Sequence, residues 1–152
     1  MLCPPGRLAG RLGLTTHMVT NGFLLDRHLD AVAAHVDRVC ISVDHPSPLH
    51  DQMRGIRGLF DKIVATTGEL RRHAPSKPII FVCTLQKANV DVATIRAMAD
   101  LLAELGVLGV FNGLREEAAT ASPDASLSAY APSQAQLTEA FATLAELKRR
   151  GY

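Results

Sequence analysis

The residues of this chain best suited to chemistry follow one apolar run. The stretch CISVDHPSPLHDQMRG, residues 40–55, contains two aspartates, two histidines and an arginine. Imidazole and carboxylate groups transfer protons and bind metal ions, so the stretch could supply an acid and a base or a metal site. The hydroxyl of Ser42 could donate to a carboxylate or accept from a ribose hydroxyl. α/β proteins place their chemistry at such strand ends.

A second group of small polar residues, Thr20, Asn21 and Gly22, ends an earlier strand-like run. At the carboxyl end of a neighbouring parallel strand these residues would lie level with Ser42. There they would suit a small polar ligand that the backbone approaches closely. Turns after strands use the same residue types, so a ligand site and a plain turn both remain open at this point.

Other site types fit the motifs less well. His50 and Asp51 form an HD pair of the kind found in metal phosphohydrolases, but such sites need helical HD residues and distant His and Asp partners. We expect this pair in a loop, where it and His45 would shape the chain. Gly55 and Gly58 precede a helix, yet their spacing matches neither of the usual phosphate-binding glycine motifs.

The cysteines and the charge balance exclude several classes. Cys3, Cys40 and Cys83 belong to no CxxC-type cluster, so the chain has no recognisable metal-ligand set of its own. Their odd number and wide spacing are typical of a reducing compartment. With 16 Lys and Arg against 15 Asp and Glu, the chain offers nucleic acid little attraction. No run resembles a signal peptide or a bilayer span, so we expect a cytoplasmic protein without a membrane partner.

Short β-like runs alternate with longer helical runs along the chain. Strands are predicted at residues 15–20, 36–43, 78–85 and 107–114, and helices at 26–35, 59–73, 91–105 and from Ser133 to the end. The third strand, PIIFVCTL, is apolar throughout, which predicts cover on both of its faces. This alternation predicts an α/β fold with parallel strands and right-handed crossovers. Four strands are too few to close a barrel, so the sheet is either small and open or part of a larger one.

The second strand indicates which residues share a face. Side chains along a strand alternate between its two faces, so Val39, Ile41 and Val43 should meet the helices. Cys40, Ser42 and Asp44 should then point into the lumen on the other face.

The five most distinctive segments occur in a fixed order. They are TNGFLL at 20–25, DRVCISVD at 37–44, LHDQMRGIRGLFDKIV at 49–64, TLQKAN at 84–89 and LAELGVLGV at 102–110. In order and spacing they resemble the middle of a radical S-adenosylmethionine (SAM) enzyme over residues 8–114. That family's pattern has a TNG strand end, an ISxD strand end, an HDxxRG loop before a helix, an N-containing turn and a GV before a strand. The final helix, ending in LKRRGY, also resembles a helix that comes after the barrel in some members.

The resemblance implies a partial parallel (β/α) barrel that holds SAM and a 4Fe-4S cluster at the strand carboxyl ends. In that family the cluster donates an electron, SAM is cleaved, and a 5′-deoxyadenosyl radical abstracts hydrogen from the substrate. By this resemblance Thr20 and Ser42 would contact the methionine or ribose part of SAM, and Asp44 and Arg54 would lie near its rim. The cofactor-binding set that it implies is Thr20, Asn21, Gly22, Ser42, Asp44 and Arg54.

The chain departs from the family pattern in two places. It lacks the CxxxCxxC cluster loop and the GGEP-like element that holds the SAM amino group, and we expect both to lie upstream of Met1. As it stands, the chain is expected to assemble no cluster. A sheet cut before its first strands would expose an edge and apolar faces, which favours self-association.

These observations predict a partial barrel at residues 1–114, a flexible connector at 115–132 and a carboxyl-terminal helix at 133–152. They leave two hypotheses. The chain is either part of a radical SAM enzyme, inactive alone, or a non-catalytic barrel remnant that acts as a binding or structural module. The substrate is not indicated, because selectivity lies largely in loops and additions outside the common fold.

Overall fold

The computed structural model describes residues 5–114 and 127–152. The described strands form one parallel sheet in the order β1-β2-β3-β4, which confirms the predicted α/β class. The strands are β1 (His17–Thr20), β2 (Arg38–Ser42), β3 (Ile79–Leu85) and β4 (Leu108–Gly113). The helices are α1 (Pro5–Arg11), the 3-10 helix η1 (Leu25–His28), α2 (Leu29–His35), α3 (Leu49–Arg54), α4 (Leu59–His73), α5 (Val92–Leu105), α7 (Leu127–Tyr130) and α8 (Gln134–Arg149).

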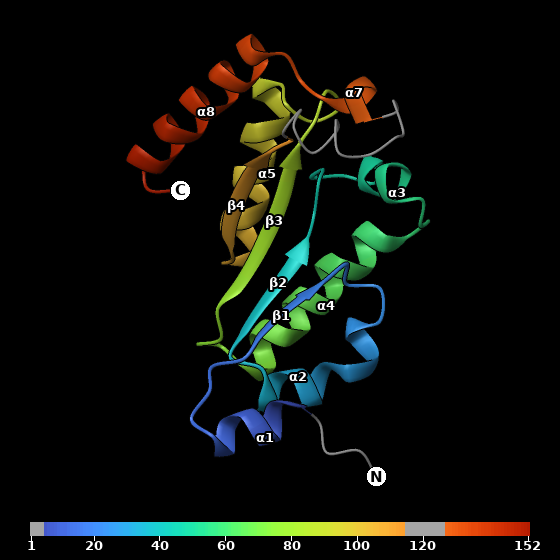
Figure 1. Ribbon diagram of the computed structural model, residues 1–152, viewed down its shortest axis with the longest axis vertical. Coiled ribbons are helices and arrows are strands. Elements are labelled where there is room, and N and C mark those ends of the chain that lie inside the picture. The colour runs from blue at the N-terminus through green and yellow to red at the C-terminus, as the bar shows by residue number, and fades with distance from the viewer. Residues whose placement is uncertain (1–4, 115–126) are drawn as a thin grey trace.

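The helices pack mainly on one face of the sheet. In Figure 1, β1 and β2 cross in front of α4, and α8 lies next to α5 at the β4 side. Strand β3 shows the resulting asymmetry, because its odd-numbered side chains from Ile79 to Leu85 are buried whereas Ile80, Val82 and Thr84 are only half-buried. The apolar run of β3 predicted cover on both faces, but among the described residues only the helix side is fully covered.

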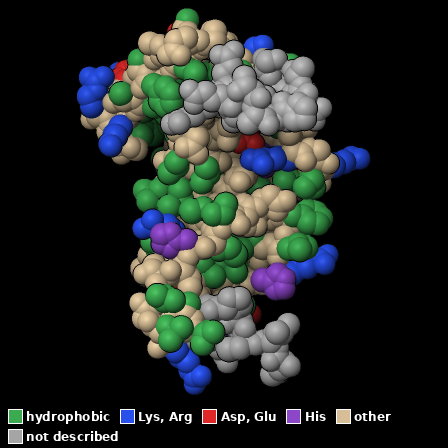
Figure 2. Space-filling view, viewed as in Figure 1, with side chains coloured by type: hydrophobic (Ala, Val, Ile, Leu, Met, Phe, Trp, Pro, Cys, Tyr) green, Lys and Arg blue, Asp and Glu red, His purple; other side chains and the backbone are tan. Residues whose placement is uncertain are grey.

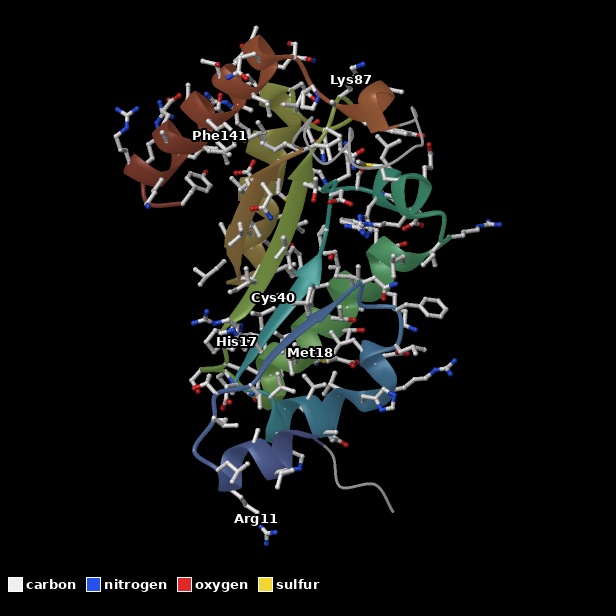
Figure 3. The ribbon with its side chains drawn as sticks, in the orientation of Figure 1. Arg11, His17, Met18, Cys40, Lys87 and Phe141 are labelled. Carbon is white, nitrogen blue, oxygen red and sulfur yellow. The ribbon has the colours of Figure 1, made fainter. Side chains whose placement is uncertain are left out.

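The opposite face of the sheet is open and apolar at its centre. Strand pairing places Val19, Cys40, Ile80 and Leu108 side by side in one row across all four strands. The outer members of this row are 74% (Val19) and 62% (Leu108) exposed. Figure 2 shows hydrophobic side chains gathered over the middle of the molecule in this view, and Figure 3 places Cys40 near the centre of the strands. We call these four residues the open-face row.

The ends of the predicted elements need some corrections. The helix expected from Asp26 is a 3-10 turn followed by α2, and Asp26 makes no helix cap but pairs with Lys62 at 3.0 Å. The capping box expected at Ser133 and Gln136 is present at the start of α8. Most of the predicted connector, residues 115–126, lies outside the described part of the chain, and its end contains α7. No helix among the described residues is long and apolar enough to cross a membrane.

Hydrogen bonds from Arg71 stabilise the amino-terminal end of the sheet. Arg71, in the last turn of α4, donates to the backbone carbonyls of Pro75 at 2.8 Å, Lys77 at 3.0 Å and Gly106 at 2.6 Å. Gly106 ends α5 in the left-handed conformation with φ 62°, which glycine adopts without strain. Arg71 therefore joins the end of α4, the approach to β3 and the end of α5.

Replacing Arg71 with alanine should destabilise the fold. The variant Arg71→Ala leaves three carbonyls without this donor, and we expect the free energy of unfolding to fall by about 2 kcal/mol in urea titrations. Arg72→Ala is the matched control, because Arg72 is three-quarters exposed and its one ion pair in the described part of the chain, with Glu69, is long at 3.9 Å. That control should change the free energy by less than about 0.5 kcal/mol. Equal effects of the two variants would contradict the role given to Arg71.

The open-face row should promote self-association through the edge strand β1. We expect the mean mass of the chain in sedimentation velocity to rise with concentration, and Val19→Lys to reduce that rise because a charge opposes burial of the edge. Ala65→Lys is the control, since Ala65 is an exposed residue on helix α4, which lies on the other side of the sheet. A wild-type chain that stays monomeric at all concentrations, or equal effects of both lysines, would refute this prediction.

Candidate functional site

The candidate site is built around Asp44, which follows β2 and is only 3% exposed. Its backbone N–H donates to Nδ1 of His50 at 3.1 Å, and its backbone carbonyl accepts from Nδ2 of Asn89 at 2.6 Å. One carboxylate oxygen accepts from the Thr84 N–H at 3.1 Å. The other lies 2.6 Å from a guanidinium nitrogen of Arg54. All four polar atoms of Asp44 therefore have partners, which lie on α3, on β3 and in the turn after β3.

The HDQMRG segment forms a short helix, α3, and not the expected loop. His50 faces Asp44 from this helix, and Arg54 at its end forms the ion pair. Asp51 accepts from the N–H groups of Gly58 and Phe60, at the start of α4. The carboxylate thus satisfies donors that helix α4 leaves free at its amino terminus. The expectation that His50 and Asp51 shape the chain is consistent with these bonds.

The hydrogen-bonding role of His50 follows from its contacts. Nδ1 accepts from the Asp44 N–H, so a neutral ring carries its hydrogen on Nε2. Among the described residues Nε2 has no hydrogen-bond partner. Burial lowers the pKa of His50. The carboxylates of Asp44 and Asp51 oppose this shift, and Arg54 and His45 add to it. When neutral, the imidazole therefore serves as a hydrogen-bond acceptor for the Asp44 N–H.

Asn89 closes the site from the turn after β3. Besides Asp44, its Nδ2 donates to the Thr84 carbonyl at 2.9 Å and contacts Sγ of Cys83 at 3.6 Å. Its Oδ1 accepts from the Gln86 N–H at 2.7 Å. Asn89 is 1% exposed. Burial raises the pKa of Cys83 to about 12, so this thiol packs as an apolar group and is a poor nucleophile.

Ser42 lies on the open face, as its place in the sequence predicted. Strand pairing puts it in a row with Val82 and Val110, next to the open-face row. The side chain is half-buried, and no hydrogen bond to its hydroxyl is found among the described residues. Arg54 is also one-third exposed, and one of its nitrogens holds Asp44. The open face therefore offers a serine hydroxyl on β2, and Arg54 stands at the edge of the strand end.

Thr20 and its neighbours form a turn instead of sharing the face of Ser42. Thr20 pairs with Ile41, whose side chain is buried against the helices, so Thr20 points to the same side. Its Oγ1 accepts from the Gly22 N–H at 3.0 Å. Asn21 is exposed, and its Oδ1 accepts from the Phe23 N–H at 3.1 Å. Of this group, Asn21 has its side chain most available to solvent.

Gly22 has a steric reason to be glycine. Its φ is 80°, and an added Cβ would come within 2.7 Å of Cγ1 of Ile63. The close approach is to a helix side chain under the sheet, and therefore to the core. The structure thus explains Gly22 by packing.

The described residues contain no group of three or more His, Cys, Asp or Glu side chains that could hold a metal ion. Cys40 lies half-buried on the open face and Cys83 is buried, while Cys3 lies outside the described part. These residues do not fit a 4Fe-4S cluster, which is usually held by several thiolates.

Sequence reasoning missed two members of the site. Thr84 contributes only its backbone N–H, which no residue type reveals. Asn89 belongs to the TLQKAN turn motif. The sequence signal for its role is an amide side chain in the turn directly after an apolar strand. Its partners lie up to 45 residues away in the chain, so its bonds could not be deduced from local sequence.

Solved structures share this fold. No family model and no curated protein match the sequence. A domain of pyruvate-formate lyase-activating enzyme from Bacteroides vulgatus is similar with a TM-score of 0.66 and 17% identity, over 91% of this chain and 80% of that domain. A radical SAM methyltransferase from Sphaerobacter thermophilus is similar with a TM-score of 0.58 and 16% identity, over 92% of this chain and 40% of that protein. The chain therefore shares its fold with these two proteins, one of which is a radical SAM methyltransferase, and this agrees with the fold that the motifs predicted.

Proposed function

We propose that this chain forms the later strands of a radical SAM barrel and binds SAM at the carboxyl end of β2. The observation that carries the proposal is the buried Asp44–Arg54 ion pair, which fixes a partly exposed guanidinium beside the strand end. A guanidinium with free N–H groups is well suited to a carboxylate, because its donors form a planar fork. The fold and the order of the motifs support the same proposal.

The available groups match different parts of SAM. Ser42 would exchange hydrogen bonds with the ribose hydroxyls or the methionine part, and Arg54 would bind the methionine carboxylate. Asn21 would contribute its side-chain amide from the end of β1. Asp44 acts through Arg54, because its own polar atoms are already bonded. Thr20 and Gly22 would shape the turn that presents Asn21.

SAM bound to a reduced cluster supplies a 5′-deoxyadenosyl radical in this family. The described residues hold no cluster ligands, so we assign no catalytic step to them. Radical chemistry would require cluster cysteines outside the described part. An open reading frame encoding CxxxCxxC upstream or on a neighbouring gene would supply them, and its absence would favour the alternative of a non-catalytic binding module.

A titration with SAM tests the binding proposal directly. We expect NMR shifts of the backbone amides at the ends of β1 and β2 and in α3. Ser42→Ala should weaken binding by roughly threefold to tenfold, in line with one lost hydrogen bond. Arg54→Lys should weaken it by about tenfold, since lysine keeps the charge near Asp44 but loses the fork.

Arg57→Lys is the matched control, because Arg57 is an exposed arginine three residues after Arg54. Its affinity for SAM should equal that of the wild type. Shifts confined to other parts of the fold, or no shifts at millimolar SAM, would rule out the proposed site.

Acid should loosen this site through His50. Protonated His50 cannot accept from the Asp44 N–H, and burial lowers its pKa in the folded chain. The unfolded chain therefore binds this proton more readily, so the stabilisation is fully present above about pH 6.5 and is lost as pH falls through the lower folded pKa. We expect the free energy of unfolding to decrease over this range in urea titrations at stepped pH.

The variant His50→Asn should flatten this pH dependence, because an amide oxygen accepts a hydrogen bond without titrating. Burial also lowers the pKa of His45, which makes His45→Asn the necessary comparison. His45 bonds Ser47 and not Asp44, so this variant should leave most of the pH dependence in place. Identical profiles for the wild type and His50→Asn would exclude His50 as the titrating group.

A further inference from the structure

We infer that Asn89 is a positioning residue for the SAM site, acting on Arg54 through Asp44. The inference rests on the proposed function and adds a residue that does not itself reach the ligand. Asn89 donates to the Asp44 carbonyl at 2.6 Å, and Arg54 holds the Asp44 carboxylate at 2.6 Å. Asp44 is the residue that both Asn89 and Arg54 contact, so we expect the influence of Asn89 on Arg54 to pass through it.

The geometry fixes Asp44 at both its backbone and its side chain. Thr84 donates its N–H to the Asp44 carboxylate at 3.1 Å, and Asn89 donates to the Asp44 carbonyl at 2.6 Å. With both bonds in place, the Cα and the carboxylate of Asp44 are held against β3. Without Asn89 the carbonyl would be a buried acceptor that has lost its strongest partner, since the remaining Cys83 Sγ contact is 3.7 Å long. Relaxation of that carbonyl would turn the carboxylate away from Arg54.

The chemistry of the contact requires an amide at position 89. Two carbonyls, of Asp44 and Thr84, need donors, and the Gln86 N–H needs an acceptor. Asparagine provides two donors and an acceptor on one short side chain. Aspartate has the same shape but no donor, and would place a buried charge beside two carbonyl oxygens. The site therefore favours asparagine over aspartate at position 89, although the two side chains have the same shape.

A double-mutant cycle in unfolding tests this coupling without any ligand. Asn89→Ser is the first variant because it keeps a small polar group, and Arg54→Ala removes the other end of the chain of contacts. We expect the effect of Asn89→Ser on the unfolding equilibrium constant to be at least about threefold smaller in the Arg54→Ala background. Additive effects, with the same change in both backgrounds, would overturn the inference.

Asp91→Ala serves as the matched control two residues from Asn89. Asp91 caps α5 by accepting from the Thr94 N–H at 2.9 Å, so its role lies in the helix and not at Asp44. Asp91→Ala should destabilise the fold. Its effect on the unfolding equilibrium constant should differ by less than about twofold between the wild-type and the Arg54→Ala backgrounds. A coupling of Asp91 to Arg54 as large as that of Asn89 would show a general effect of instability and would also overturn the inference.

SAM affinity provides the second readout, measured at a temperature where each variant is folded by circular dichroism. Asn89→Ser should weaken SAM binding by about tenfold in the wild-type background, and by less than about twofold when Arg54 is already lysine. Equal weakening in both backgrounds would show that Asn89 acts independently of Arg54. If the wild-type chain does not bind SAM, the proposed function fails, while the unfolding cycle still decides whether Asn89 positions Arg54.

Discussion

The carboxyl end of this sheet depends on the burial of one charged residue. A carboxylate removed from water is unfavourable unless its oxygens find donors and an opposite charge lies near it. Asp44 meets this condition through Arg54 and Thr84, while its backbone is held by His50 and Asn89. The requirement joins three separate parts of the chain at one point. Removing one partner would leave an unsatisfied group in the interior, so the site behaves as a unit.

The two ends of the sheet are stabilised by different means. At the amino-terminal end, Arg71 binds three backbone carbonyls. At the carboxyl-terminal end, Arg54 binds a single carboxylate and keeps part of its guanidinium exposed. Figure 3 shows Lys87 at this second end, in the turn after β3, where its N–H bonds the Tyr130 carbonyl. The hydrogen bonds of Arg71 thus serve the fold, whereas Arg54 keeps part of its guanidinium exposed at the strand end, where parallel α/β folds place their chemistry.

The sequence predicted those features that depend on local periodicity. Alternation along β2 correctly placed Ser42 on the open face, and the Ser133 capping box is a contact between residues three apart. Thr20 shows where that reasoning stops: strand ends alone do not fix the face, which depends on its pairing with Ile41. The short helix α3 was missed because six residues contain too little periodicity to separate a helix from a loop. The partners of Asp44 lie as far as 45 residues away, and only the folded chain brings them together.

The Asp44 site and the open face of the sheet differ in how fully their groups are paired or buried. Polar atoms around Asp44 are almost fully paired, whereas the open-face row leaves Val19 and Leu108 mostly in water. Exposed apolar side chains aligned across four strands form a surface that favours burial, since each buried aliphatic side chain contributes about 1.5–3 kcal/mol. The Asp44 site therefore finds nearly all of its hydrogen-bond partners among the described residues, His50 Nε2 excepted, whereas those residues leave the open face without apolar cover. The open face is therefore the part of the sheet where burial of further apolar surface would stabilise the fold most.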